Sequence, residues 1–409
     1  MSLKFKIISL KLITILIVLC MFSTGCIQKP QKKVSNQQFN ISFSKKELKD
    51  MYNLSVQWLI SNIKDKGIFQ YIYNPVTKIY PSKNNMIRQL MASRVLADFA
   101  QNNHTLKSIH QKNLDFIFTY WYQETNDMGY ILYNNKSKLG AMAMALRTLV
   151  YSPFYKTYEL EANKIANTIL HLQNQNGSFE PWFVKPNYSY DKSYLLTFYS
   201  GEAILSLLEY YQLTKKPNIL QKAILAQNYY LDKYVTHLSD NYYPSYVPWH
   251  TMSLYELYLI TKNKTYANAI ITLNDKLLEL QDTSNLVTLG RFYNDSTPEY
   301  GSPHSSSDAI YTESLAIAYK TASKINDSYH LKKYKKALVL SIHNLLSLQY
   351  HTKNEKLRGA LRYNKDDARI RVDTTQHTVD ALNKLIQLDS HNFKIYCYHN
   401  KNKIRIPLN

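Results

Sequence analysis

Four carboxylates, Glu202, Asp308, Glu313 and Asp373, lie at or near the starts of segments that we predict to be helices. Glu202 and Glu313 fall within largely apolar helical segments, where a carboxylate needs either a partner or a chemical role. Asp308 and Asp373 have an alternative role as part of a helix cap, because each adjoins Ser or Thr residues at a helix start. A pair of carboxylates, one acid and one base or nucleophile, is the minimum for glycoside hydrolysis.

A second set of side chains near the same helix starts could carry proton transfer instead. Its members are His250, His377, Tyr199, Tyr311, Arg88 and Arg371. Tyr and His would supply the acid and the base, and Arg would neutralise a carboxylate on the substrate, as a lyase or a uronate epimerase requires. His250 and His377 each lie between apolar helix positions, where the common alternative is a hydrogen-bonded core histidine. The sequence therefore supports either chemistry, hydrolysis by the carboxylates or proton transfer by the Tyr, His and Arg set.

Aromatic side chains complete the candidate site. The chain has 36 Tyr against 14 Phe and 4 Trp, and a ring with a polar edge suits stacking on sugars. The predicted substrate-binding residues are Arg88, Trp182, Tyr199, Trp249 and Arg371. The predicted catalytic residues are Glu202, Asp308, Glu313, His250, Tyr311, Asp373 and His377. No cofactor or metal is expected, since the cysteines required for a cysteine-rich metal site are missing.

Six short aromatic turns, most of them containing glycine, divide the chain at intervals of about 50 to 70 residues, a period typical of repeated helical units. They contain Gly67-Ile68-Phe69, Gly129-Tyr130, Gly177-Ser178-Phe179, Tyr242-Tyr243-Pro244, Gly290-Arg291-Phe292 and Gly359-Ala360-Leu361. Twelve helices in six pairs can close into a ring. The turns then meet at one end of that ring, its mouth, and bring the candidate residues together.

Two kinds of helical segment alternate along the chain. The amphipathic segments, predicted to be outer helices, are 45–63, 107–121, 155–174, 217–235, 264–281 and 329–349. The other segments, 85–101, 138–150, 194–213, 248–261, 307–325 and 374–388, include stretches that are small or apolar on nearly all faces, which indicates burial as inner helices. Segments 286–293 and 359–372 are strand candidates, expected as hairpins or extended lobes at the mouth. The predicted fold is an all-α (α/α)6 toroid.

The first 26 residues have the order of an export signal, with early lysines, an apolar run and then Ser23-Thr24-Gly25-Cys26. The ending resembles a lipobox, which implies lipidation of Cys26. The alternative is an uncleaved anchor over 7–25. Either version predicts a protein held at the cell membrane and facing the extracellular side. We assign 27–44 to a polar tether, 45–390 to the toroid and 391–409 to a basic tail.

The net charge of +20 favours anionic partners such as acidic glycans or lipid headgroups. The simpler interpretation is a Lys-rich composition with solvated lysines on the outer helices. Export argues against a nucleic-acid partner. The predicted partners are therefore a glycan or acidic polysaccharide and, through the N-terminus, a membrane.

The span from about 45 to 390 resembles the six-hairpin, glycosidase-like (α/α)6 superfamily. The resemblance is carried by Tyr199-Ser200-Gly201-Glu202-Ala203-Ile204-Leu205 and by Ser253-Leu254-Tyr255-Glu256-Leu257-Tyr258. Within that superfamily the chain is most similar to the C-terminal domain of D-glucuronyl C5-epimerases. The resemblance implies carbohydrate chemistry at the mouth of the ring.

Other toroidal families lack support in this sequence. Gln173-Asn174-Gln175-Asn176-Gly177-Ser178-Phe179 is similar to the repeat of terpene cyclases, but an Asp-rich acid motif is missing. Protein prenyltransferases and lanthionine cyclases need cysteine ligands, and in thioester domains a cysteine stands where this chain has Ser200. We therefore predict a glycoside hydrolase or a uronate lyase or epimerase. The alternatives are a non-catalytic glycan- or surface-polymer-binding lipoprotein and a scaffold for a membrane assembly.

Overall fold

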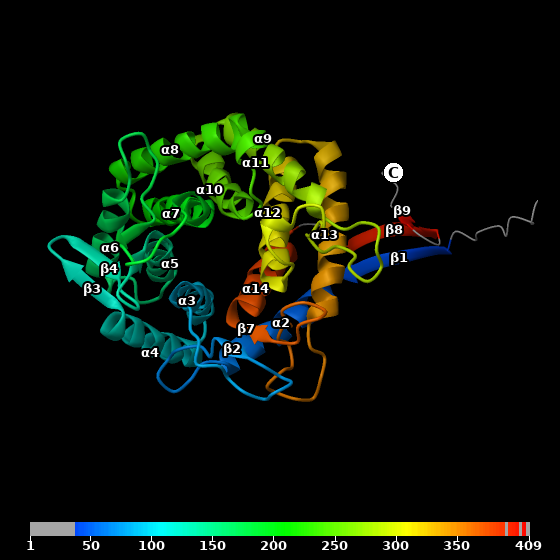
Figure 1. The fold of residues 1–409 in the computed structure, drawn as a ribbon, viewed down its shortest axis with the longest axis horizontal. Coiled ribbons are helices and arrows are strands. Elements are labelled where there is room, and N and C mark those ends of the chain that lie inside the picture. Colours follow the sequence, from blue (N-terminus) through cyan, green and yellow to red (C-terminus); the bar gives the residue numbers. More distant parts are fainter. Residues whose placement is uncertain (1–36, 389–391, 401–402, 406–409) are drawn as a thin grey trace, which may run out of the picture.

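The computed structural model describes residues 37–388, 392–400 and 403–405, and twelve helices in this part form two concentric rings (Figure 1). The outer helices are α2 (Lys45–Ser61), α4 (His104–Tyr120), α6 (Glu159–His171), α8 (Pro217–Leu231), α11 (Lys264–Leu277) and α13 (Ser328–Leu348). The inner helices are α3 (Met86–Ala100), α5 (Leu139–Val150), α7 (Lys192–Thr214), α10 (Tyr246–Thr261), α12 (Ser305–Lys324) and α14 (Val372–Ile386). The predicted (α/α)6 toroid is confirmed, and no predicted bound is more than four residues from the observed one.

The two rings differ in burial as their sequences predicted. Every residue of α5 from Leu139 to Leu149 is buried, because neighbouring helices cover it on all sides. The outer helix α11 buries one stripe, including Ile270 and Leu273, and exposes the opposite face. The ring closes where α14 packs against both α2 and α3.

Four of the aromatic turns touch the backbone of the next outer helix, through Gly67, Gly177, Gly290 and Gly359. Gly359 has a φ of +86°, and a Cβ there would lie 2.1 Å from the carbonyl oxygen of Leu54 on α2. Glycine is needed at such a position for both its left-handed backbone and its small size. The contact between Gly359 and α2 joins the last turn to the first helix of the ring.

Short elements fill the connections. A π-helical turn (η1, Asp232–Thr236), α9 (Leu238–Asn241) and two 3₁₀ turns (η2, Leu278–Leu280; η3, Pro298–Tyr300) lie between the longer helices. Antiparallel pairs join β2 (Ile72–Tyr73) to β7 (Ile370–Arg371), β3 (Tyr122–Thr125) to β4 (Met128–Ile131), and β5 (Ser137–Lys138) to β6 (Trp182–Val184). The strand candidate 359–372 contains β7, whereas in 286–293 a turn over 286–290 is followed by a single antiparallel bridge between Phe292 and Gln281.

A three-stranded sheet projects from the ring beside α13 (Figure 1). Its order is β1 (Gln37–Ser44), β8 (Asn392–Asn400) and β9 (Lys403–Arg405), and β1 pairs with β8 along its whole length. The tether predicted over 27–44 is therefore wrong for 37–44, because strand pairing with the C-terminal segment orders these residues. Cys26 and the export signal lie outside the described residues. Within the described ranges, no helix is both long and apolar enough to cross a bilayer.

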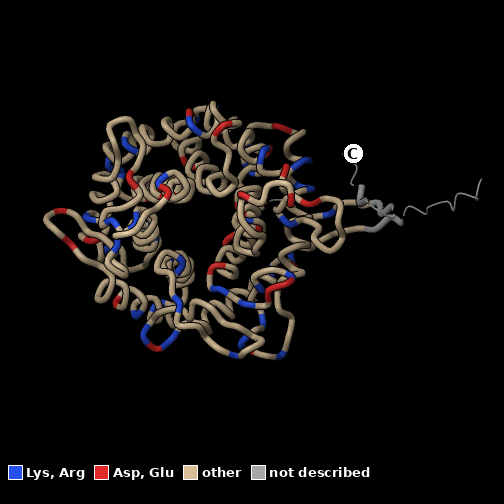
Figure 2. Tube along the Cα trace, viewed as in Figure 1, with Lys and Arg blue, Asp and Glu red and all other residues tan. Residues whose placement is uncertain are grey.

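Lys and Arg residues are spread widely over the outer helices and the loops of the ring (Figure 2). This distribution fits the simpler interpretation of the positive charge, solvated lysines on outer faces.

Candidate functional site

A cavity of about 460 Å³ lies where the inner helices begin, so it occupies the mouth of the ring. This volume is in the range of about 300–1,000 Å³ that is usual for small-ligand sites. Its charged and titratable lining residues are Arg88, Lys138, Glu202, His304, Asp373 and His377. Its aromatic lining residues are Tyr194, Phe198, Tyr199, Tyr243, Trp249, Tyr300, Tyr311 and Tyr363.

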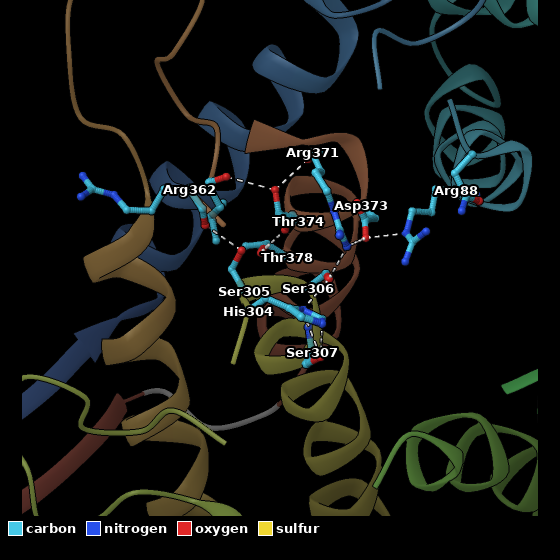
Figure 3. A network of polar contacts seen from close by, with 12 residues as sticks. Arg88, His304, Ser305, Ser306, Ser307, Arg362, Arg371, Asp373, Thr374 and Thr378 are labelled. Carbon is cyan, nitrogen blue, oxygen red and sulfur yellow. Dashed lines mark hydrogen bonds and ion pairs between the residues drawn. The ribbon is translucent and has the colours of Figure 1, made fainter. Parts of the chain in front are cut away.

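One wall of the cavity is built around the carboxylate of Asp373 (Figure 3). Arg88 Nε of α3 donates to Asp373 Oδ2 at 2.8 Å, and Arg371 donates to both carboxylate oxygens, at 2.9 Å from Nε to Oδ1. Burial by itself would raise the pKa of Asp373, but Arg88 and Arg371 outweigh it and hold the pKa well below its usual range. Asp373 is therefore a charged group whose two oxygens are both occupied.

His304 joins the start of α12 to this wall. Its ring accepts a hydrogen bond from the Ser307 amide at 3.1 Å, and its Nδ1 lies 2.9 Å from the Ser306 hydroxyl. Arg371 Nη2 donates to the same Ser306 hydroxyl at 3.3 Å. Burial, with a smaller contribution from Arg371, lowers the pKa of His304 to about 4. His304 is therefore a neutral N-cap at neutral pH.

Glu202 of α7 lines the cavity without a counter-ion in contact. It is 2% exposed, and its Oε2 has no hydrogen-bond partner among the described residues. Burial raises its pKa to about 8, although Arg147, Arg88 and Lys138 act in the opposite direction. Gly140 leaves room for the carboxyl group, because a Cβ there would lie 2.4 Å from Glu202 Oε2. At neutral pH this carboxyl group is mainly protonated and can donate a proton.

His377 of α14 lies at the floor of the cavity, 6.2 Å from Trp249 between ring centroids. Its Nδ1 is buried and has no hydrogen-bond partner in the described part of the chain. Burial lowers the pKa of His377, while the charge of Glu313 opposes this shift. A neutral imidazole can accept a proton, so His377 and Glu202 give the cavity a base and an acid.

Three other predicted catalytic residues lie outside the cavity lining. His250 is in the core, where its ring nitrogens lie 3.1 Å from Ser200 Oγ and 3.2 Å from Gln227 Nε2, and burial lowers its pKa to about 3. Asp308 is buried and accepts from the Phe292 amide at 2.9 Å. The predicted catalytic roles of these two residues do not fit their positions, because their polar atoms are engaged away from the cavity.

The hydrogen bonds of Asp308 explain its position further. Asn344 Nδ2 of α13 donates to it at 2.8 Å, so the carboxyl group links the fifth turn to an outer helix. Burial raises the pKa of Asp308 to about 6, and the bonds from Phe292 and Asn344 limit that rise. Glu313 is the third predicted catalytic residue outside the lining. It lies beneath His377, which forms the floor of the cavity, and it accepts a hydrogen bond from Lys384 Nζ at 2.6 Å.

The predicted substrate-binding residues also divide into those that line the cavity and those that do not. Arg88, Tyr199 and Trp249 line the cavity, as does the predicted catalytic Tyr311, and Arg371 lies behind Asp373. Trp182 is not a lining residue; its ring is buried, and the Nζ of the lining residue Lys138 lies 5.3 Å from its centroid.

The predictions omitted several aromatic lining residues, notably Tyr243, Tyr300 and Tyr363. The rings of Tyr194, Tyr243 and Tyr300 form one continuous edge, with centroids 5.7 Å and 5.5 Å apart. Tyr243 belongs to the fourth aromatic turn, and that position could have indicated its role. Tyr300 ends the 3₁₀ turn η3 and Tyr363 lies in the loop before β7, in long connections where the sequence gives little indication of side-chain direction.

A metal site can be tested at Glu313, His377 and Asp380, which each place a ligand atom within 4.8 Å of the others. Both carboxylates already have cationic partners, Lys384 for Glu313 and Arg94 for Asp380. A metal ion would have to displace or lie beside these cations, so the residues do not fit a metal site well.

The concentric helix rings, with a polar cavity where the inner helices begin, define the predicted (α/α)6 toroid, and solved structures that share this fold include glycoside hydrolases. No protein-family model matches the chain, and no curated protein matches it significantly in sequence. A D-mannose isomerase is 13% identical with a TM-score of 0.66, over 84% of this chain and 98% of the isomerase.

Two glycoside hydrolases have the same fold. A family 76 enzyme from a bovine Bacteroides thetaiotaomicron strain is 14% identical with a TM-score of 0.59, over 85% of this chain and 80% of the other. An inactive variant of the α-1,6-mannanase of Salegentibacter sp. HEL1_6, solved with α-1,6-mannotetrose, is 11% identical with a TM-score of 0.59, over 84% and 100%. Such identities establish the fold alone. The particular likeness to D-glucuronyl C5-epimerases stays a prediction.

Proposed function

We propose that this protein is an enzyme that binds a saccharide at the mouth of the toroid and transfers a proton to it from Glu202. The observation that carries the proposal is the state of Glu202, a carboxyl group that lines the cavity while its Oε2 is buried against Gly140 without a hydrogen-bond partner among the described residues. A carboxyl group with a pKa of about 8 is a suitable general acid near neutral pH. The aromatic edge of Tyr194, Tyr243 and Tyr300 offers stacking surfaces for sugar rings.

Proton transfer at carbon, as in isomerases, epimerases and lyases, is the reaction class that we favour. His377 would accept the proton from a carbon next to a carbonyl or carboxylate group, and Glu202 would donate one to the developing enolate oxygen. Asp373 would serve poorly as a base or nucleophile, because Arg88 and Arg371 occupy both of its oxygens. Sugar isomerisation is found on this fold, in the D-mannose isomerase.

Glycoside hydrolysis is the second candidate, and one observation favours it. Glu202 and Asp373 both line the cavity, and their environments move their pKa values in opposite directions. Such divergence is typical of an acid and its partner carboxylate in glycosidases. In this version Glu202 keeps its role as the acid, and Asp373 replaces His377 as its partner.

The experiment offers D-mannose, D-glucuronate and α-1,6-mannotetrose to the purified protein in D₂O and follows them by NMR. We expect deuterium to enter a carbon position with wild type, and Glu202→Gln and His377→Asn to abolish this exchange while circular dichroism stays unchanged. New reducing ends without exchange at carbon would assign hydrolysis instead. Full turnover by Glu202→Gln would reject the proposal.

A non-catalytic glycan-binding lipoprotein remains the alternative from another class. It predicts that wild type binds saccharides without converting them and that Glu202→Gln binds equally well. Trp249→Ala would then weaken binding, because Trp249 lines the cavity. Calorimetric titration beside the NMR assay separates these outcomes.

We also propose that the protein is exported and held at the outer side of the membrane through a lipid on Cys26. The support is the sequence order of the first 26 residues, which lie outside the described part. Labelled palmitate should be incorporated into wild type and not into Cys26→Ala. Labelling that persists in Cys26→Ala would reject lipidation at this residue.

A further inference from the structure

Two buried carboxylates, Glu313 and Asp380, lie beneath His377, the residue at the floor of the cavity. His377 lines the cavity, whereas its Nδ1 is buried and unpartnered among the described residues, so Nε2 is the nitrogen left for the cavity. Glu313 of α12 and Asp380 of α14 each place a carboxylate oxygen within 4.8 Å of a ring nitrogen. The imidazole therefore lies between the cavity and two buried carboxylates.

The two carboxylates differ in how many of their oxygens already accept a hydrogen bond. Asp380 Oδ1 accepts from Arg94, and Oδ2 accepts from Gln376 Nε2 at 2.6 Å, so both oxygens are occupied. Glu313 Oε1 accepts from Lys384 Nζ at 2.6 Å, and no described residue donates to Oε2. Glu313 is consequently the carboxylate with an acceptor oxygen to spare for His377.

We propose that Glu313 is a positioning residue for His377, which keeps the proton of the neutral ring on Nδ1 and leaves Nε2 free to accept a proton from the substrate. This inference rests on the proposed function, since it assumes that His377 is the base. A carboxylate close behind an imidazole favours the tautomer that has its proton on the facing nitrogen. Here Glu313 acts through its charge at a distance within 4.8 Å, since Nδ1 has no hydrogen-bond partner among the described residues. Glu313 thus acts through His377 and does not need to touch the substrate.

Charged groups on several helices act on His377, and they determine in which direction each variant should move its pKa. Glu313, Asp373 and Asp380 raise its pKa, whereas burial and Arg88 lower it. Arg94 and Arg147 line the small space beneath the ring with Glu313. Lys384 is paired with Glu313 and weakens its effect on the ring. Removing Glu313 or removing Lys384 should therefore move the pKa of His377 in opposite directions.

The experiment compares the pH dependence of kcat for wild type, Glu313→Gln and Lys384→Met. A neutral base loses activity below its pKa, so the acid limb reports His377. We expect this limb to move to lower pH in Glu313→Gln, with kcat reduced by about 10- to 100-fold and KM little changed. In Lys384→Met the limb should move to higher pH. Glu313→Asp, which keeps the charge, should recover part of kcat.

Opposite shifts separate positioning from a merely structural role, because both variants break the same Lys384–Glu313 ion pair. Unchanged limbs, or limbs that move in the same direction, would overturn the inference. If Glu313→Gln does not fold, Lys384→Met and Glu313→Asp still decide the direction. Loss of wild-type activity on chelation with EDTA would assign the carboxylates to a metal ion and overturn it as well.

The proposed function fails separately from this inference. Full activity in His377→Asn would show that His377 is not the base, and it would reject both the proposed function and the role of Glu313. An inactive His377→Asn variant together with unshifted limbs in the other two variants would reject only the role of Glu313.

Discussion

Arg88 of α3 and Asp373 of α14 form an ion pair of 2.8 Å between residues that are 285 positions apart in the sequence. The helices α3 and α14 meet only when the ring closes. This ion pair therefore links two helices that meet at ring closure and also forms part of one wall of the cavity (Figure 3). This double role makes the cavity sensitive to the stability of ring closure.

Asp373→Asn should lower the free energy of unfolding by up to about 3 kcal/mol, because it leaves Arg88 and Arg371, whose side chains are 33% and 16% exposed, without their counter-charge. Urea denaturation at pH 7, followed by circular dichroism, measures the change. Asp366→Asn is the matched control, since Asp366 is exposed in the loop that precedes β7 and α14, and it should change stability by less than about 0.5 kcal/mol. Equal midpoints for the two variants would contradict a role in closure.

The raised pKa of Glu202 should make the folded state less stable as pH rises. An unfolded Glu titrates near 4.5 and folded Glu202 near 8, so the folded state binds the extra proton between these values. Stability is then lost as pH rises through this window. Glu202→Gln stays neutral and should become more stable than wild type as pH rises from 5 to 8, by on the order of a few kcal/mol.

The measurement is the difference in urea midpoint between wild type and Glu202→Gln at pH 5, 6.5 and 8. The same titration should reduce kcat of wild type above about pH 8, because the acid loses its proton. A constant difference across the three pH values would contradict a neutral Glu202 in the folded protein.

His250 and His377 should behave oppositely when each is changed to Asn. His250→Asn removes core hydrogen bonds to Ser200 and Gln227 and should cost about 2 kcal/mol of stability, with kcat of the folded fraction retained. His377→Asn should abolish turnover at little cost in stability. Thermal melting and turnover measured on both variants test the pair, and a stable but inactive His250→Asn would restore His250 as a catalytic candidate.

The pH dependence of stability offers a second measurement on His250. Burial lowers its pKa to about 3, whereas an unfolded His titrates near 6.5. The unfolded chain therefore binds the extra proton between these values, and stability falls as pH decreases below about 6.5. His250→Asn should show a weaker acid dependence than wild type.

Gly359→Ala should destabilise the ring more than Gly301→Ala. Both glycines have a positive φ, but a Cβ at Gly359 would lie 2.1 Å from the Leu54 carbonyl, whereas at Gly301 it would have no described atom within 4 Å. Backbone strain of about 1 to 3 kcal/mol is common to both substitutions, and Gly359→Ala adds a clash that separates the last turn from α2. Similar melting temperatures for the two variants would exclude the clash as a source of destabilisation.

The sequence by itself determined the ring. Helix periodicity and the aromatic turns are local signals, and the alternation of amphipathic and apolar helices specifies which ring each helix joins. Glu202 could be singled out for the same reason, because a carboxylate in a segment as apolar as Ala203-Ile204-Leu205 needs an explanation wherever the helix points.

Only the tertiary structure decided which of two residues adjacent in the sequence faces the cavity. Trp249 and His250 are adjacent on α10, and a rotation of about 100° per residue turns one toward the cavity and the other into the core. Asp308 and Asp373 both follow helix-start signals, yet one binds a turn and an outer helix while the other meets Arg88. Those partners come from distant parts of the chain, and helix rotation and ring closure, which no local pattern encodes, bring them together.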